Sequence, residues 1–174
     1  MIKDDVFRKT EGHLYRYYNT LKKIKALEEE CKELEKQKEK IKQDLKETKV
    51  SIDTELNMGI DYSRSKIQTS NDGTSYAEKA LVKEIEKLEK EWFYVRKKYL
   101  KKRIKIRELE RQIYTLKCNL LMLSEENKRF LELKYGDKKS IDEIAYILNI
   151  ARATVYRKRE ELIEDIARWV NLIG

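Results

Sequence analysis

Apolar residues recur every three or four positions between residues 76 and 123, and this repeat constrains the fold more than any other feature. Its members are Leu81, Ile85, Leu88, Trp92, Val95, Tyr99, Ile106, Leu109, Ile113, Leu116, Leu120 and Leu123. Only Lys102 interrupts the series. Such spacing places one apolar stripe along an α-helix, and that stripe must be buried against another helix. We therefore expect one long helix over residues 76–123.

A second repeat of the same kind covers residues 1–56, from about Asp4 to Leu56. Its members are Leu14, Tyr17, Leu21, Ile24, Leu27, Cys31, Leu34, Ile41, Leu45, Thr48 and Ile52, with Lys38 as the interruption. At 1.5 Å per residue this helix would be about 80 Å long, so it needs an equally long partner. The partner is either the second helix of the same chain, as a hairpin, or a second chain, as a homodimer.

Residues 57–75 break the repeat and contain Gly59 and the run Asn71-Asp72-Gly73, which predicts a loop. Ile60, Tyr62 and Ile67 alternate with charge there and could lie along a partner, although composition favours a solvated hinge. The chain has no proline and 41% charged residues. These features predict an all-α protein in which long coiled-coil helices precede a small C-terminal domain, residues 124–174.

The apolar residues also bear on location. We find no apolar leader of the signal-peptide type and no run approaching about twenty apolar residues, so we expect a cytoplasmic protein that does not enter a membrane. Cys31 and Cys118 lack metal-type spacing and are expected to be reduced thiols that serve packing.

The C-terminal domain contains a helix-start signal. Ser140 followed by Glu143 is a capping box, in which each side chain accepts a hydrogen bond from the other residue's backbone N–H. A helix should therefore begin at Ile141, with Ile144 and Leu148 as its apolar stripe.

A sharp turn and a second helix should follow. Asn149 is suited to the turn because asparagine tolerates the left-handed conformation. Ala145 is small enough for the second helix to approach closely, and Ile150 and Val155 would close a small core. The second helix is expected over residues 151–167. Because these residues stand at mutually consistent offsets, we interpret the pair as a helix-turn-helix that binds DNA, the alternative being an ordinary solvated helical hairpin.

The outward face of that second helix would meet DNA. The residues expected to contact bases are Arg152, Ala153, Tyr156 and Arg157, and those expected to contact phosphates are Lys139, Ser140, Thr154 and Lys158. Arginine can pair bidentately with guanine, an alanine methyl can meet a thymine methyl, and hydroxyl groups can bind phosphates or base edges.

The net charge of +8 is concentrated in one place. Residues 1–94 hold 20 basic and 20 acidic side chains, residues 95–123 hold 10 and 2, and residues 124–174 hold 10 and 10. The expected auxiliary basic patch consists of Arg96, Lys97, Lys98, Lys101, Lys102, Arg103, Lys105 and Arg107. It could follow a DNA backbone, remain a solvated helix face, or pair with the acidic first helix.

Catalysis has little support. The single histidine, His13, has no second imidazole with which to share a metal ion or proton, and we expect it at the surface. The sequence contains no glycine-rich phosphate loop and no nucleophile elbow. We therefore expect no enzyme activity, no metal site and no cofactor.

The segment SEENKRFLELKYGDKKSIDEIAYILNIARATVYRKREELI resembles the C-terminal promoter-reading domain, region 4, of sigma factors. It is more similar to late-gene transcription regulators of Gram-positive phages and prophages, the RinA and ArpU type, and the likeness extends loosely to residues 60–70. One departure is Ala151, where such domains usually place a capping serine.

We expect a transcriptional regulator that binds double-stranded DNA as a dimer through its long helices, activates or represses transcription, and could contact host RNA polymerase. The resemblance implies activation of phage late or packaging genes. The alternative is a DNA-packaging recognition or assembly subunit, similar to a small terminase, that oligomerises through its long helices.

Overall fold

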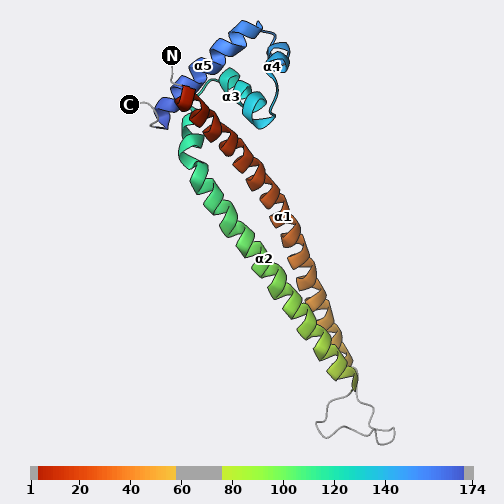
Figure 1. Cartoon of the computed structure of the whole chain (residues 1–174). Coiled ribbons are helices and arrows are strands. Elements are labelled where there is room, and N and C mark those ends of the chain that lie inside the picture. Colours follow the sequence, from red (N-terminus) through yellow and green to blue (C-terminus); the bar gives the residue numbers. More distant parts are fainter. Residues whose placement is uncertain (1–3, 58–75, 171–174) are drawn as a thin grey trace, which may run out of the picture. The chain divides into compact units, whose positions relative to one another are not determined.

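The computed structural model describes residues 4–57 and 76–170, with side chains described over 4–48 and 79–170. The described residues are helical and contain no strand, which confirms the all-α class. The elements in chain order are α1 (Asp4–Asn57), α2 (Tyr76–Leu121), α3 (Glu125–Leu131), the π-helical turn η1 (Glu132–Gly136), α4 (Ile141–Leu148) and α5 (Arg152–Trp169) (Figure 1). The predicted loop, with Ile60, Tyr62 and Ile67, lies outside the described residues except for Asn57, which ends α1.

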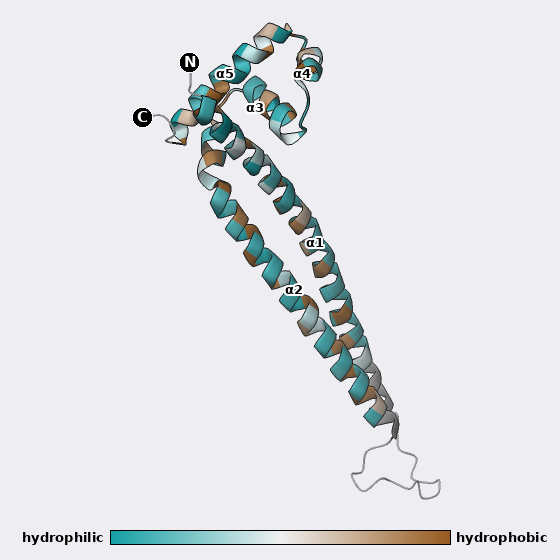
Figure 2. Ribbon diagram, viewed as in Figure 1, coloured by the Kyte–Doolittle hydropathy of each residue, from teal (hydrophilic) through white to brown (hydrophobic). Residues whose placement is uncertain are grey.

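The long helices α1 and α2 pack together side by side and run in opposite directions (Figure 1). Every described side chain of the two predicted apolar repeats is buried or half-buried. The remaining faces of both helices are mainly hydrophilic (Figure 2). Of the two pairings that the repeats allow, the chain adopts the hairpin.

The chain divides into two compact units. The hairpin unit consists of residues 28–104, and the composite unit consists of residues 1–27 together with 105–174. The helices α3, α4 and α5 therefore share a compact unit with the first turns of α1 and the last turns of α2. The domain expected from the sequence began only at residue 124.

Both polar interruptions of the apolar repeats have partners inside the hairpin unit. The ammonium group of Lys38 lies 5.4 Å from the centre of the Tyr99 ring, as a cation–π contact. Lys102 forms an ion pair with Glu30 on the opposite helix. The two lysines therefore bridge α1 and α2 instead of breaking the seam between them.

The composite unit has the larger core. Its fully buried side chains include Leu14, Ile106, Phe130, Leu131, Tyr135, Ile144, Val155, Ile163 and Ile166. These residues come from α1, α2, α3, η1, α4 and α5, so each element of the unit contributes to one shared core.

The cysteines are free thiols: Cys31 is buried and Cys118 is half-buried. Burial raises the pKa of the Cys31 thiol, which keeps it in the uncharged form. Among the described helices, none combines the length and apolar character required to cross a bilayer.

Candidate nucleic-acid interface

The helix α4 begins as the capping box predicts. The Ser140 side chain accepts a hydrogen bond from the Glu143 backbone N–H at 3.2 Å. In return, the Glu143 carboxylate accepts one from the Ser140 N–H at 2.8 Å. The hydrogen bond from the Ser140 N–H to the Glu143 carboxylate, followed by the one from the Lys139 side chain, lowers the pKa of Glu143 to about 2. The first turn of α4 is thus held by a carboxylate that is ionised over the whole neutral range.

Asn149 ends α4 in the left-handed conformation, with φ 52° and ψ 46°. The backbone N–H of Ile150 then donates to the Ala145 carbonyl at 3.1 Å, which closes the turn. Beneath it, Ile144 and Val155 are both completely buried. The predicted start of α4 and its turn residue are present, and Val155 is buried as expected, whereas Ile150 is only half-buried.

The helix α5 begins at Arg152 without a side-chain cap, because Ala151 has no hydrogen-bonding group to offer. Its first backbone bond runs from the Val155 N–H to the Ala151 carbonyl at 3.1 Å. The backbone N–H groups of Arg152, Ala153 and Thr154 have no carbonyl partner within the helix. Free N–H groups at the start of a helix favour the binding of an anion. The first turn of α5 also contains no carboxylate.

The outward face of α5 contains the four predicted base contacts, and Arg152, Ala153, Tyr156 and Arg157 are all exposed. Arg152 is 3.1 Å from the Asp142 carboxylate, and its guanidinium lies 5.9 Å from the centre of the Tyr156 ring. Arg157 has no ion-pair partner within the described part of the chain. The opposite face of the helix is buried through Val155, Leu162, Ile163, Ile166 and Ala167. The structure therefore places the four side chains together, on the face that the core leaves open.

The predicted phosphate contacts are largely engaged within the protein. Lys139 pairs with Glu143 at 2.9 Å, and Lys158 pairs with Glu126. Ser140 is occupied in the capping box, and Thr154 is half-buried. Lys139, Ser140 and Lys158 thus have partners within the protein as they stand.

A basic residue that sequence reasoning did not single out lies beside them. Lys138 precedes α4, is exposed, and has a positive φ of 58°. It has no ion-pair partner among the described residues. Its position two residues before the capping serine Ser140, in the segment that leads into α4, was a signal that could have identified it.

The auxiliary basic patch is exposed along α2 except at one position. Lys102 is half-buried and paired with Glu30, as the third of the sequence alternatives predicts. Arg96 lies over the Trp92 ring and Lys98 over the Tyr94 ring, at 5.1 and 4.4 Å from the ring centres. The patch spans residues of both compact units, since residues 96–103 belong to the hairpin unit and Lys105 and Arg107 to the composite unit.

A polar network that the sequence did not indicate connects α5 to α1. One carboxylate oxygen of Glu11 in α1 accepts a hydrogen bond from the Tyr135 hydroxyl at 2.8 Å. The same oxygen accepts two from Arg159, at 2.9 and 2.6 Å. Tyr135 is completely buried, and this burial, with the Glu11 charge second, raises the pKa of its hydroxyl. The network joins α1, η1 and α5, two residues from the exposed Arg157.

The turn η1 is also seated against α1. A Cβ atom added to Gly136 would lie 3.2 Å from the Tyr18 ring, and the Gly136 carbonyl accepts a hydrogen bond from Lys22. Tyr15 meets Tyr135 edge-on, with ring centres 5.0 Å apart. The run Lys-Tyr-Gly, quoted above as part of a family resemblance, is therefore a packing element of this protein.

Comparison with models of known protein families, with curated proteins and with solved structures finds no match for this chain.

Proposed function

We propose that the protein is a sequence-specific DNA-binding regulator of transcription, in which α4 and α5 act as a helix-turn-helix. In this proposal α5 enters the major groove of double-stranded DNA. The observation that carries it is the division of α5 into a buried face and an open face that holds Arg152, Ala153, Tyr156 and Arg157. Arginine, tyrosine and a methyl group form a surface suited to base edges.

The first turn of α5 supports the same placement of this helix in the major groove. Three N–H groups without an intrahelical partner, and a first turn without carboxylates, favour a DNA phosphate at that end. Lys138 and the exposed members of the basic patch supply charge for sequence-independent, salt-sensitive affinity. Lys102 and Lys105 are left out of this group because Glu30 and Glu108 already pair with them.

Arg157 and Arg168 provide the test of base reading, since both are exposed arginines of α5. A binding site would first be selected from a random duplex library with the purified protein. We expect Arg157→Ala to weaken binding to that site by about 1–3 kcal/mol and to relax preference at one base position. Arg168→Ala, near the other end of α5, should leave both unchanged.

The selection has two informative failures. If no duplex is enriched, even at low salt, the proposal of sequence-specific binding is wrong. If Arg157→Ala weakens all duplexes alike, Arg157 contacts phosphate and another residue of α5 reads the sequence.

Our more specific proposal, which rests on the sequence resemblance, is activation of phage late genes together with host RNA polymerase. Transcription from a late promoter, measured with and without the protein, tests it. An increase that Arg157→Ala abolishes would support the activator. Unchanged transcript levels, together with a ring-sized mass in solution, would support the packaging subunit instead.

A further inference from the structure

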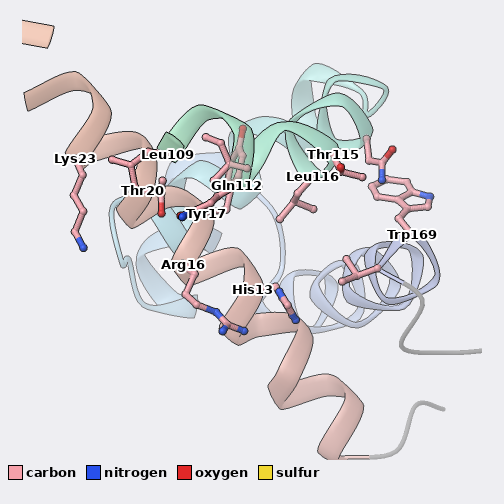
Figure 3. A pocket seen from close by; sticks show the side chains of 13 residues that line it. His13, Arg16, Tyr17, Thr20, Lys23, Leu109, Gln112, Thr115, Leu116 and Trp169 are labelled. Carbon is pink, nitrogen blue, oxygen red and sulfur yellow. The ribbon is translucent and has the colours of Figure 1, made fainter. Parts of the chain in front are cut away.

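The composite unit contains a cavity of about 550 Å³ that the proposed function does not use. Its walls come from α1 around His13 and Arg16, from the last turns of α2, and from the end of α5 at Trp169 (Figure 3). Pockets for small molecules commonly have volumes of about 300–1,000 Å³. The cavity is therefore large enough for a small organic ligand.

One part of the cavity is apolar. Leu109 and Ile113 are buried and line it. Leu116 and the Trp169 indole line it from different helices (Figure 3). An aromatic or branched apolar group placed between Leu116 and Trp169 would be removed from water on both sides.

The other part of the cavity is electropositive. Arg16 and Lys23 line it, and no lining residue carries a carboxylate. The Nε of Arg16 donates to the Gly12 carbonyl at 3.1 Å, which holds the guanidinium and leaves its terminal nitrogens for other acceptors. Neither Arg16 nor Lys23 has an ion-pair partner among the residues that the structure describes.

Neutral polar groups complete the lining. Gln112, Thr115 and Asn119 recur at helical spacing along one side of α2. His13 is half-buried and also lines the cavity. Its burial, with the Arg16 charge second, lowers the pKa of its ring, so His13 offers one donor and one acceptor at neutral pH.

We propose that this cavity binds a small organic anion, namely a carboxylate, sulfonate or phosphate attached to an apolar body. The anionic group would pair with Arg16 beside His13, and the body would lie against Leu116 and Trp169. Lys23, further along α1, adds to the positive potential that attracts the ligand. This binding site is separate from the open face of α5.

Trp169 provides the readout, because the chain has 2 tryptophans and Trp92→Phe leaves Trp169 as the single one. Fluorescence of the Trp92→Phe protein would be titrated with phenyl phosphate, benzenesulfonate and hexanoate. Benzyl alcohol serves as the uncharged probe and inorganic phosphate as the anion without an apolar body. We expect a saturable change with at least one organic anion, about tenfold tighter than with benzyl alcohol or inorganic phosphate.

Variants locate the binding site. Arg16→Gln should weaken the organic anion about tenfold, whereas Lys25→Gln, an exposed α1 lysine outside the cavity, should not. Leu116→Phe, which fills the apolar part, should abolish binding, with circular dichroism confirming that the protein remains folded. The proposal is overturned if no organic anion gives saturation, if benzyl alcohol binds equally well, or if Arg16→Gln and Lys25→Gln have equal effects.

Discussion

Glu11 has an effect on the C-terminal helices that its position in the sequence does not suggest. It lies within the first turns of α1, yet its carboxylate accepts hydrogen bonds from Tyr135 and Arg159. Nothing in the local pattern marked it, because a glutamate among long-helix residues is usually a solvated charge. A cluster of tyrosines, Tyr15, Tyr17 and Tyr18, was the available signal that this end of α1 has more than one packed face.

Glu11→Ala should lower the free energy of unfolding by about 3 kcal/mol. The change leaves the Tyr135 hydroxyl and the Arg159 guanidinium without their acceptor in a largely buried place. Urea denaturation followed by circular dichroism would measure it. The matched control is Glu28→Ala, which removes an exposed glutamate of the same helix. Equal midpoints for the two variants would show that the network contributes no net stability.

For the four predicted base contacts, in contrast, helical spacing in the sequence was enough to predict their exposure. Arg152, Ala153, Tyr156 and Arg157 were chosen from helical spacing, and the structure leaves all of them exposed on one face. Spacing sufficed there because exposure on a helix follows from periodicity once the buried stripe is known. It did not suffice for Lys158, whose partner Glu126 lies 32 positions earlier in another helix, whereas the pair of Lys139 with Glu143 is a local contact four residues apart.

At the scale of single elements, α4 depends on its cap. Ser140→Ala removes the side-chain acceptor of the Glu143 N–H and should cost about 1 kcal/mol of stability. Thermal unfolding of the two proteins at neutral pH would measure the difference. The matched control is Ser124→Ala, because Ser124 caps α3 with a longer bond of 3.4 Å to the Asn127 N–H. A larger loss from Ser124→Ala would contradict the stronger role assigned to Ser140.

The same cap predicts a pH dependence. The pKa of Glu143 is lowered from 4.5 to about 2 in the folded protein, so its ionised form stabilises the fold at all pH values above the unfolded pKa. That contribution is lost as the pH falls from about 4.5 to about 2. Glu143→Gln should therefore be less stable than the parent at neutral pH, and the difference should disappear by the acid end of this range. A difference that does not depend on pH would show that the charge contributes nothing.

Lys38 and Lys102 interrupt the apolar seam of the long helices, and both have partners on the opposite helix of the hairpin. Lys102→Leu should stabilise the hairpin by about 1 kcal/mol, since a partly exposed ion pair contributes little and an apolar residue would continue the seam. Lys97→Leu, at an exposed position of α2, is the control and should not stabilise it. Urea unfolding gives the comparison. Loss of stability in Lys102→Leu would mean that the Glu30 pair is worth more than apolar burial.

At the scale of the whole molecule, the C-terminal helices share their compact unit with residues 1–27 and with the end of α2. Residues 1–27 supply Glu11, Leu14 and Tyr18 to the packing and the polar network of that unit. The sequence indicated α1, α2, α4 and α5 but not α3 or η1, and it indicated a boundary at residue 124. Charge distribution and apolar periodicity predict individual helices, but neither predicts which distant segment packs against an apolar face.

A fragment of residues 124–174 should therefore unfold without cooperativity, because Tyr135 and Arg159 would lose their partner. Residues 1–27 joined by a flexible linker to residues 105–174 should unfold cooperatively. Thermal circular dichroism of both fragments makes the comparison. Cooperative unfolding of the shorter fragment would show that α3, α4 and α5 suffice for a stable fold.

The sequence by itself determined the helices α1, α2, α4 and α5, the apolar seams of the long helices, the cap and turn of α4, and the open face of α5. Each depends on interactions within about one helical turn or on a repeat along one helix, and such patterns are written directly in residue order. Only the tertiary structure decided that α1 pairs with α2 of the same chain, that Glu11 holds Tyr135 and Arg159, and that His13 and Trp169 meet around one cavity. The Glu30–Lys102 pair of the hairpin joins residues 72 positions apart, and the Glu11 contacts join residues more than 100 positions apart. Which distant partner a side chain meets depends on how all the apolar faces are buried together.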